Sequence, residues 1–286
     1  MSIVVTGATG ELGRLVVERL LATVPAGEVV AVVRDEGRAA ALAARGVRLR
    51  VADYDRPETL AHAFGAGDRV LLISGNEVGR RVPQHTAVIG AARAAGVAQL
   101  AYTGVLGGPD ADFRLAAEHK VTERLILDSG LPYTFLRNGW YTENYTANLA
   151  PVLRHGTVVA NAGDGRVASA TRADYAAAAA AVLTGEGHLA ATYELSGDVA
   201  WSLAEYADAV AAASGKEITY SDVPAATHQE ILVRAGLPED FAAILVDVDE
   251  AVRRGLLAGT TGDLARLIGR PTTPMAETVA AAVAAL

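Results

Sequence analysis

Three regularly spaced glycines are the first residues of the sequence that point to a particular chemistry. Gly7, Gly10 and Gly13 follow the pattern G-x-x-G-x-x-G, directly after the apolar residues 3–5. In a dinucleotide-binding loop the first glycine makes the turn, the second lets a pyrophosphate approach the backbone, and the third permits close helix packing. The N-terminus of the next helix then holds the phosphates. We therefore predict cofactor contacts from Gly7, Ala8, Thr9, Gly10, Glu11, Leu12 and Gly13.

A glycine-rich turn before a surface helix would show the same spacing. The apolar run at residues 29–33, however, follows at the distance expected of a βαβ unit, which favours the dinucleotide site. The residue after that run indicates the cofactor, because NADP sites supply an arginine to the 2'-phosphate whereas NAD sites place a carboxylate near the ribose 2'-hydroxyl. Arg34 comes first, with Arg38 close enough to assist. Asp35 follows Arg34 directly and leaves NAD use open, but we predict NADPH.

Polar or small residues also end three later apolar runs, at 47–51, 69–73 and 97–103. The carboxyl ends of parallel strands meet at one edge of a sheet, so these residues are expected to face the same crevice. The acid at 53 can reach the adenine edge or cap the helix that begins near Pro57, and the sequence leaves both roles open. Residues 74–76 leave room for the nicotinamide half. The predicted cofactor site is completed by Asp53, Ser74, Gly75, Asn76 and Thr103.

Composition limits the classes of partner. The 286 residues are 51% hydrophobic and 20% charged, which fits one large α/β domain, or a large domain with a smaller one, rather than disorder. A net charge of -8 argues against nucleic acid as a direct partner. Cysteine is absent and the six histidines form no H-E-x-x-H pair, so no metal site is expected. No run is long enough for membrane insertion and the N-terminus shows no secretory signal, so we expect a cytoplasmic protein.

Alternating strands and helices predict the fold class: α/β, with a Rossmann-type doubly wound parallel sheet and a smaller C-terminal substrate lobe. The NADPH-binding domain is expected at 1–137 with a return segment at 174–197, and the smaller lobe at 138–173 and 198–286. A turn at 163–166 is expected between polar strands, and everything after Trp201 is interpreted as helix and loop. Asp174 is expected to cap the helix at 175–183. Strands are predicted at 3–5, 29–33, 47–51, 69–73, 97–103, 133–137 and 192–195, and helices at 12–20, 39–44, 83–95, 115–128, 175–183, 203–214, 228–235, 241–255 and 273–286.

Several of these stretches together resemble the NmrA-like atypical short-chain dehydrogenases/reductases, and the similarity runs essentially end to end. The glycine motif is shared by many unrelated enzymes, but the blocks NGWYTENY at 138–145 and ASATRADY at 168–175 are specific. The other matching stretches are TGATG at 6–10, Arg34, Ser74, YT at 102–103, LPYT at 131–134 and LIGRPTT at 267–273. Within the family the chain looks most like the bacterial NADPH-dependent type 2 quinone oxidoreductases, which implies hydride transfer from NADPH to a quinone.

The resemblance also implies site residues. Ordinary short-chain dehydrogenases use Tyr-x-x-x-Lys as the acid, but here alanine stands four residues before each of the two lysines, Lys120 and Lys216. His119 occupies the position of the lysine in lysine-using atypical relatives. It is predicted to hold the nicotinamide ribose or donate to the quinone oxygen, with a structural histidine at the lobe junction as the alternative. The predicted catalytic residues are Asn144 and His119, and the predicted substrate-binding residues are Trp140, Tyr141 and Asn144.

Two classes of function remain open at this point. The first is a quinone reductase with a cleft between the lobes, whose partner is a small quinone or similar planar acceptor. A related reductase of triphenylmethane dyes belongs to the same class. The second is an NADP(H)-binding redox sensor that catalyses nothing, since NmrA-like relatives include such regulators. The absence of Tyr-x-x-x-Lys fits both, a roomy acceptor cleft would favour the enzyme, and the sequence leaves a homodimer open.

Overall fold

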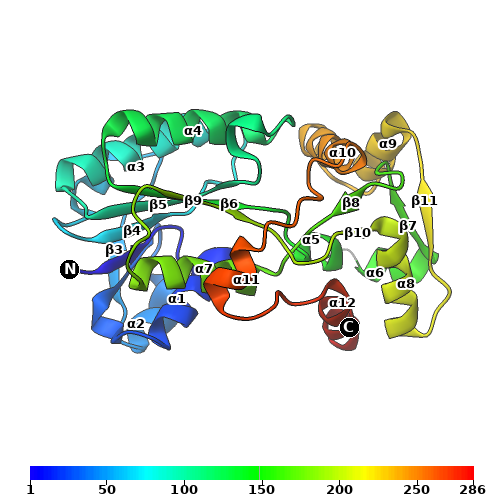
Figure 1. Ribbon diagram of the computed structural model, residues 1–286, viewed down its shortest axis with the longest axis horizontal. Coiled ribbons are helices and arrows are strands. Elements are labelled where there is room, and N and C mark those ends of the chain that lie inside the picture. The colour runs from blue at the N-terminus through cyan, green and yellow to red at the C-terminus, as the bar shows by residue number, and fades with distance from the viewer. Residues whose placement is uncertain (148) are drawn as a thin grey trace.

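A seven-stranded parallel sheet organises the computed structural model, which describes residues 1–147 and 149–286 (Figure 1). The strand order is β3-β2-β1-β4-β5-β6-β9, and every neighbouring pair is parallel. The order reverses between β1 and β4, which is where parallel sheets of this kind bind ligands. The predicted doubly wound Rossmann-type sheet is thus confirmed. Its strands are β1 (Ile3–Val5), β2 (Val29–Val33), β3 (Arg48–Val51), β4 (Arg69–Leu72), β5 (Gln99–Val105), β6 (Tyr133–Asn138) and β9 (Ala191–Leu195).

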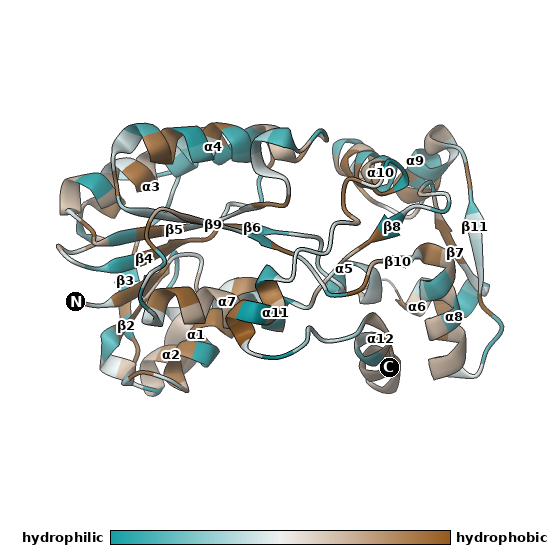
Figure 2. Cartoon of the chain, in the orientation of Figure 1, coloured by the Kyte–Doolittle hydropathy of each residue, from teal (hydrophilic) through white to brown (hydrophobic). Residues whose placement is uncertain are grey.

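Helices cover both faces of the sheet. Figure 1 shows α3 and α4 on one face and α1, α2, α7 and α11 on the other. Strands buried on both faces must be apolar throughout, and all five residues of β2 are buried. Figure 2 accordingly shows hydrophobic residues along the sheet and hydrophilic ones on α4. The helices of this lobe are α1 (Glu11–Leu21), α2 (Ala40–Ala44), α3 (Arg81–Ala95), α4 (Ala116–Ser129), α7 (Arg172–Thr184) and α11 (Asp263–Ile268), with short 3-10 turns at η1 (Ala26–Glu28), η2 (Gly37–Ala39), η3 (Pro57–His62) and η4 (Gly108–Asp110).

A smaller lobe with its own core lies beyond the carboxyl edge of the sheet. Trp201 and Tyr206 are buried at its centre, 5.9 Å apart between ring centroids. Two short sheets frame it, β10 with β8 antiparallel and β11 with β7 parallel. Among the described residues no helix is long and apolar enough to cross a membrane. The elements of this lobe are α5 (Glu143–Thr146), α6 (Leu149–His155), β7 (Thr157–Ala160), β8 (Arg166–Val167), β10 (Trp201–Ser202), α8 (Leu203–Ser214), β11 (Thr219–Asp222), α9 (Ala225–Arg234), α10 (Glu239–Arg253) and α12 (Met275–Ala284).

The two cores exchange segments across the predicted lobe boundaries. Leu264 of α11 is buried in the core beside α1 and α7, although it lies within 198–286. Phe113 and Ala116 are buried in the core of the smaller lobe, although they precede residue 138. The division of the chain into two lobes at residues 137, 174 and 197 therefore stays a prediction. The helix α11 and the start of α4 each contribute to the core of the lobe to which the prediction did not assign them.

Of three local predictions, two are wrong. The segment after Trp201 contains the strand β11, whose residues Thr-Tyr-Ser-Asp carry no alternating apolar pattern that could reveal it. The turn expected at 163–166 does lie between two strands, β7 and β8, although each of them pairs with a distant partner. Thr171, not Asp174, caps α7, because its Oγ1 accepts the backbone N–H of Asp174 at 3.1 Å.

Asp174 instead anchors the C-terminal segment. The carboxylate is fully buried and accepts from Arg270 Nη2 at 2.6 Å, from the Thr273 backbone N–H at 2.9 Å and from Thr273 Oγ1 at 3.3 Å. Next to it, Asp198 and Thr272 exchange two hydrogen bonds, of 2.9 and 2.7 Å. These contacts fix the strap that leads from α11 to α12, so one buried carboxylate connects α7 to the last helix of the smaller lobe.

We expect Asp174→Asn to lower the free energy of unfolding by about 2 kcal/mol, because one acceptor oxygen becomes an N–H donor facing groups that also donate. Urea denaturation followed by circular dichroism measures the change. Asp208→Asn on the exposed side of α8 is the matched control and should leave stability within about 0.5 kcal/mol of the parent. Equal stabilities for the two variants would contradict the anchoring role.

Candidate active site

The glycine loop packs as closely as its spacing predicts. Gly7 has a positive φ of 58°, and its carbonyl oxygen accepts the Gly10 N–H at 2.9 Å. A Cβ at Gly13 would lie 2.2 Å from the Gly7 oxygen and 2.8 Å from the Ala8 Cα, so only glycine fits there. The helix α1 begins with no side-chain cap at Gly10. Its first N–H groups are therefore available to a phosphate, which is the property that a pyrophosphate site requires.

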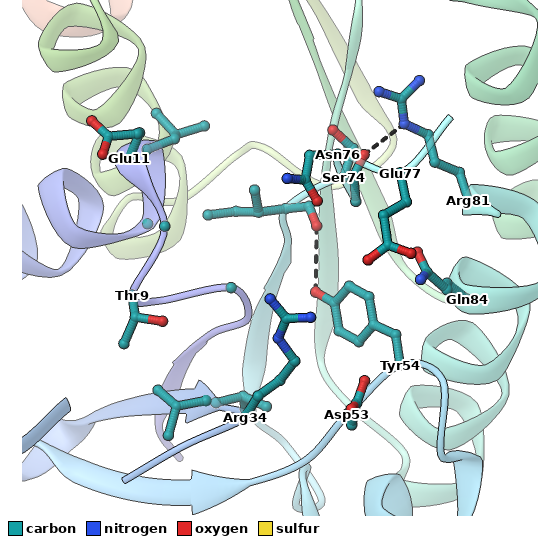
Figure 3. A pocket seen from close by; sticks show the side chains of 18 of the residues that line it. Thr9, Glu11, Arg34, Asp53, Tyr54, Ser74, Asn76, Glu77, Arg81 and Gln84 are labelled. Atoms are coloured by element: carbon teal, nitrogen blue, oxygen red, sulfur yellow. Dashed lines mark hydrogen bonds between the residues drawn. The ribbon is translucent and has the colours of Figure 1, made fainter. Parts of the chain in front are cut away.

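A groove of about 580 Å³ runs from this loop along the carboxyl ends of β1, β2 and β4 (Figure 3). It includes most of the predicted cofactor residues, together with others on β2, on α3 and in the 138–145 and 168–175 blocks. Its lining residues are Gly7, Thr9, Gly10, Glu11, Leu12, Gly13, Val32, Val33, Arg34, Arg38, Ala52, Asp53, Tyr54, Ile73, Ser74, Gly75, Asn76, Glu77, Arg81, Gln84, Tyr141 and Arg172.

Arg34 and Arg38 both line the groove and are exposed, and neither guanidinium forms an ion pair within the described part of the chain. Figure 3 shows the Arg34 side chain pointing into the groove beside Tyr54. Asp35 turns elsewhere, because its Oδ1 accepts the Gly37 backbone N–H at 2.8 Å. Two available guanidinium groups and an occupied carboxylate fit a 2'-phosphate better than a bare ribose hydroxyl.

Tyr54 is a groove residue that the sequence interpretation missed. Its hydroxyl donates to Thr6 Oγ1 and lies 3.3 Å from the Ile73 carbonyl oxygen, so it connects the ends of β1 and β4 (Figure 3). Burial raises the pKa of this hydroxyl well above its usual value, so it remains a donor at any working pH. Its position directly after Asp53 was the available signal. Asp53 lines the groove and caps no helix, since its Oδ1 accepts the Asp55 N–H and η3 has no side-chain cap.

Buried polar side chains fix the backbone of the loop at 74–76 by hydrogen bonds. Thr103 Oγ1 accepts the Ser74 N–H at 2.9 Å, and His85 Nε2 accepts the Gly75 N–H at 3.0 Å. Arg81 Nε donates to the Gly75 carbonyl oxygen at 2.6 Å (Figure 3). A Cβ at residue 75 would lie 2.7 Å from the side-chain oxygen of Gln84. Both backbone groups of Gly75 are therefore fixed, which positions the nicotinamide end of the predicted site.

His85 and His119 are neutral members of this buried cluster. Burial, and secondly the Arg81 cation, lower the pKa of His85 to about 4 and that of His119 to about 3. Since Nε2 of His85 accepts from Gly75, its Nδ1 carries the hydrogen and donates to Thr122 Oγ1 at 2.9 Å. Burial likewise raises the pKa of Tyr102, whose hydroxyl forms a hydrogen bond of 2.7 Å with His119 Nδ1.

A second cavity, of about 460 Å³, lies in the smaller lobe and is lined mainly by apolar and aromatic side chains of α6, β7, α9 and α10. Trp140 and Asn144 line it, whereas Tyr141 lines the groove. Arg172 connects the two, because its Nη2 donates to Asn144 Oδ1 at 3.0 Å while its guanidinium lies 4.9 Å from the centre of the Tyr141 ring. The two cavities therefore adjoin each other at this side-chain contact.

Most of the predicted site residues thus lie together. Two predicted cofactor residues do not line the groove: Ala8 is buried in the core, and Thr103 supports the loop at 74–76 from behind. His119 lines neither cavity, and a ring with so low a pKa is not protonated at neutral pH. Its position does not support proton donation to a quinone, and it remains a candidate positioning residue. No group of His, Cys, Asp and Glu within the described residues could hold a metal ion.

Sequence reasoning passed over several groove residues. Arg38 was named only as an assistant. Glu77 lies in the loop before α3, and Arg81 and Gln84 lie in the first turn of α3, and none of the three belongs to a distinctive motif. Arg172 belongs to the specific 168–175 block, so its place in that block was the signal that could have identified it. Contact with the cofactor itself stays a prediction for every residue of the groove.

The sheet order, the glycine loop on an uncapped α1 and the available arginines after β2 define a dinucleotide-binding protein of the Rossmann type. Residues 7–186 match the NAD(P)H-binding family, and the chain belongs to that family. It is 48% identical to quinone oxidoreductase 2 of Escherichia coli K12, over 97% of each chain.

Two crystal structures extend the comparison. One is an NADPH-dependent quinone oxidoreductase from Escherichia coli in complex with NADPH, with a TM-score of 0.95, 48% identity and coverage of 98% of this chain and 99% of that one. The other is triphenylmethane reductase of Citrobacter in complex with NADP(H), with a TM-score of 0.94, 42% identity and coverage of 98% and 100%. The predicted membership of the NmrA-like atypical short-chain dehydrogenases/reductases is confirmed.

We expect Arg34→Ala to weaken NADPH binding by roughly 2 to 4 kcal/mol, on the order of 30-fold or more, because the 2'-phosphate loses a charge-assisted contact. NADH binding should barely change, and Arg34→Lys should restore only part of the affinity, since an ammonium lacks the planar fork. Calorimetric titration with both cofactors checks this. Arg56→Ala, an exposed arginine outside the groove, is the control. Equal weakening of NADH and NADPH would mean that Arg34 supports the fold instead.

The neutral histidines make stability depend on pH. The pKa values of both imidazoles are lower in the folded than in the unfolded protein, so the unfolded chain binds protons more tightly. The free energy of unfolding therefore falls as the pH drops below about 6.5, the pKa of histidine in the unfolded chain. From about pH 7.5 to about pH 5.5 each buried histidine should cost about 1.4 kcal/mol of unfolding free energy. In urea denaturation at both pH values, His119→Gln should show a smaller drop than the parent. His62→Gln, at an exposed histidine, should show the full drop.

Proposed function

We propose that this protein is an NADPH-dependent quinone reductase. The observation that carries the proposal is the contact between the two cavities, where Arg172 of the groove holds Asn144 of the smaller lobe at 3.0 Å. The groove has the phosphate-binding loop and the available arginines that NADPH requires, and the lobe cavity has the volume and aromatic lining that a planar acceptor requires. The relatives named above are reductases that use the same cofactor, which supports the assignment.

The chemistry that NADPH supplies is a hydride, so the overall reaction converts NADPH, a proton and a quinone into NADP+ and a hydroquinone. The protein's part is to bind and orient. The loop at 74–76, fixed by Thr103, His85 and Arg81, positions the nicotinamide end of the groove. Asn144 accepts from Arg172 through its oxygen, which leaves its N–H groups directed elsewhere and available to a ring carbonyl.

A strong acid is not needed for this reaction. The hydroquinone product is an aromatic, delocalised phenolate when it forms, so solvent can supply the proton after the hydride has moved. This accounts for a site in which Tyr-x-x-x-Lys is absent and His119 is neutral. Positioning of the two reactants then supplies most of the catalysis.

Two alternatives give different results in the same assay. A redox sensor would bind NADP(H) with a filled acceptor cleft, whereas the lobe cavity of about 460 Å³ supports turnover. A reductase of triphenylmethane dyes would share the same cavities and differ only in its acceptor. The similarity to triphenylmethane reductase of Citrobacter is the observation that supports this second alternative.

Loss of absorbance from NADPH, measured with purified protein and several benzoquinones and naphthoquinones, tests the function. We expect enzyme-dependent oxidation of NADPH by at least one quinone. Asn144→Ala should lower kcat/KM for the quinone about tenfold or more and leave NADPH affinity intact, whereas Arg34→Ala should raise the KM for NADPH and leave the quinone KM intact. No turnover with any quinone, together with turnover of a triphenylmethane dye, would replace the proposal with the dye reductase. No turnover with either class would favour the sensor.

A further inference from the structure

Asp249 and His228 are neighbouring lining residues of the cavity in the smaller lobe, and we call this pair the floor of the cavity. Asp249 is the one carboxylate among its described lining residues, and no lysine or arginine is among them. Trp140, Tyr145 and Tyr206 supply aromatic surface, and most of the remaining lining is aliphatic. Two histidines, His155 and His228, also line the cavity, and His228 Nδ1 lies 3.3 Å from Asp249 Oδ2. While both imidazoles are neutral, a flat aromatic molecule in this cavity would therefore meet one negative charge that no lining cation neutralises.

The hydrogen bonds of the floor show which atoms remain available. Asp249 Oδ2 accepts the Asn161 backbone N–H at 3.2 Å and lies 3.3 Å from His228 Nδ1. Asn161 Nδ2 donates to the Val246 carbonyl oxygen, so its Oδ1 must be the acceptor that lies 2.7 Å from His228 Nδ1. His228 Nδ1 therefore carries a hydrogen. These contacts use Oδ2 and Nδ1, which leaves Oδ1 of Asp249 and Nε2 of His228 for a ligand.

Both side chains are buried, so their contacts are not those of a solvated surface. His228 is 6% exposed and Asp249 9%, and both line the cavity. The negative charge also acts on a second lining residue, because burial, and secondly the Asp249 carboxylate, raise the pKa of Tyr145 well above its usual value. Tyr145 follows Asn144 directly, so the field of the floor extends to the side of the cavity that adjoins the cofactor groove.

We propose that this cavity holds the acceptor and that Asp249 makes it selective for charge, accepting neutral or cationic planar aromatic molecules and rejecting anionic ones. The inference rests on the proposed function and adds the class of acceptor. An anion brought into an apolar cavity beside a carboxylate is repelled and has no cation to pair with, whereas a cation gains both the carboxylate and the aromatic faces. His228 Nε2 and Asp249 Oδ1 add two acceptors for a hydroxyl group or an N–H of the ligand.

The test uses three naphthoquinones of one shape: menadione, a sulfonated derivative and a derivative that carries a trimethylammonium group. Steady-state oxidation of NADPH gives kcat/KM for each at about pH 8.5, where ordinary imidazoles are neutral. Quenching of tryptophan fluorescence, to which Trp140 contributes, gives Kd for each without cofactor. We expect the wild type to prefer the cationic over the anionic compound about tenfold or more in both measurements, after correction for the intrinsic reactivity of each quinone with NADPH analogues.

Two variants and one control test whether the charge of Asp249 causes the preference. Asp249→Asn keeps an oxygen for the Asn161 N–H but removes the charge, and should reduce the preference about tenfold, which equals about 1.4 kcal/mol. Ile231→Lys, at a cavity residue that is 37% exposed, adds a cation at the rim and should shift the preference toward the anionic compound. Glu250→Gln removes the same unit of charge from α10 at a residue that pairs with Arg253 outside the cavity, and should leave the ratio unchanged.

The two proposals fail differently. Turnover of menadione without any charge preference, or a preference that neither variant changes, would overturn the charge selection and leave quinone reduction standing. A charge preference in Kd that responds to both variants, with no turnover of menadione, would keep the acceptor class and reject quinone reduction. If Asp249→Asn fails to fold, the result for Ile231→Lys decides, since that position is partly exposed on α9.

Discussion

The close approach of Gly13 to Gly7 is the contact on which the rest of the molecule depends. With no side chain at residue 13, α1 packs directly on the loop after β1, and its uncapped N-terminus reaches the point where the strand order reverses between β1 and β4. Parallel strands with crossover helices leave a crevice at that point. The helix α7 packs with α1 in the same core and begins at Arg172. One helix pair therefore closes the core beneath the sheet and also places the residue that joins the groove to the lobe cavity.

Much of this arrangement could be predicted from the sequence, because the features that specify it are local. Buried parallel strands appear as continuous apolar runs, and the run at 29–33 coincides with β2. The helix α8 lies at the predicted residues 203–214, where Ser202 and Glu205 form a capping box. Arg34 was identified by its place after β2, and the structure leaves it available in the groove. Each inference needed only neighbouring residues and a known period.

The remaining features depend on contacts between distant segments, which no local pattern encodes. Asp174 stands where a cap could be, yet its oxygens bind residues 270 and 273, because the strap to α12 passes over the start of α7. The strand β11 exists because β7 offers an edge, since its own residues are polar and few. His119 occupies the position of a lysine in relatives, but Tyr102 and Arg81 surround it here. Type and spacing identified these residues, and only tertiary packing determines what each one binds.

Charge divides the two cavities in a way that matches the proposed reaction. Arg34 and Arg38 line the groove after β2, where an anionic phosphate is expected, and Arg172 lines it where it adjoins the lobe cavity. Beyond that arginine the lobe cavity has one carboxylate and no lysine or arginine among its described lining residues. An anionic cofactor is therefore attracted to one cavity and repelled from the other, although the two cavities adjoin at the 3.0 Å contact between Arg172 and Asn144. In the proposed reaction this arrangement would hold an acceptor of different charge beside the cofactor without competition for one site. Hydride transfer needs the two rings in contact, and the Arg172 to Asn144 pair lies where the two cavities adjoin, which is the position that the proposed reaction requires.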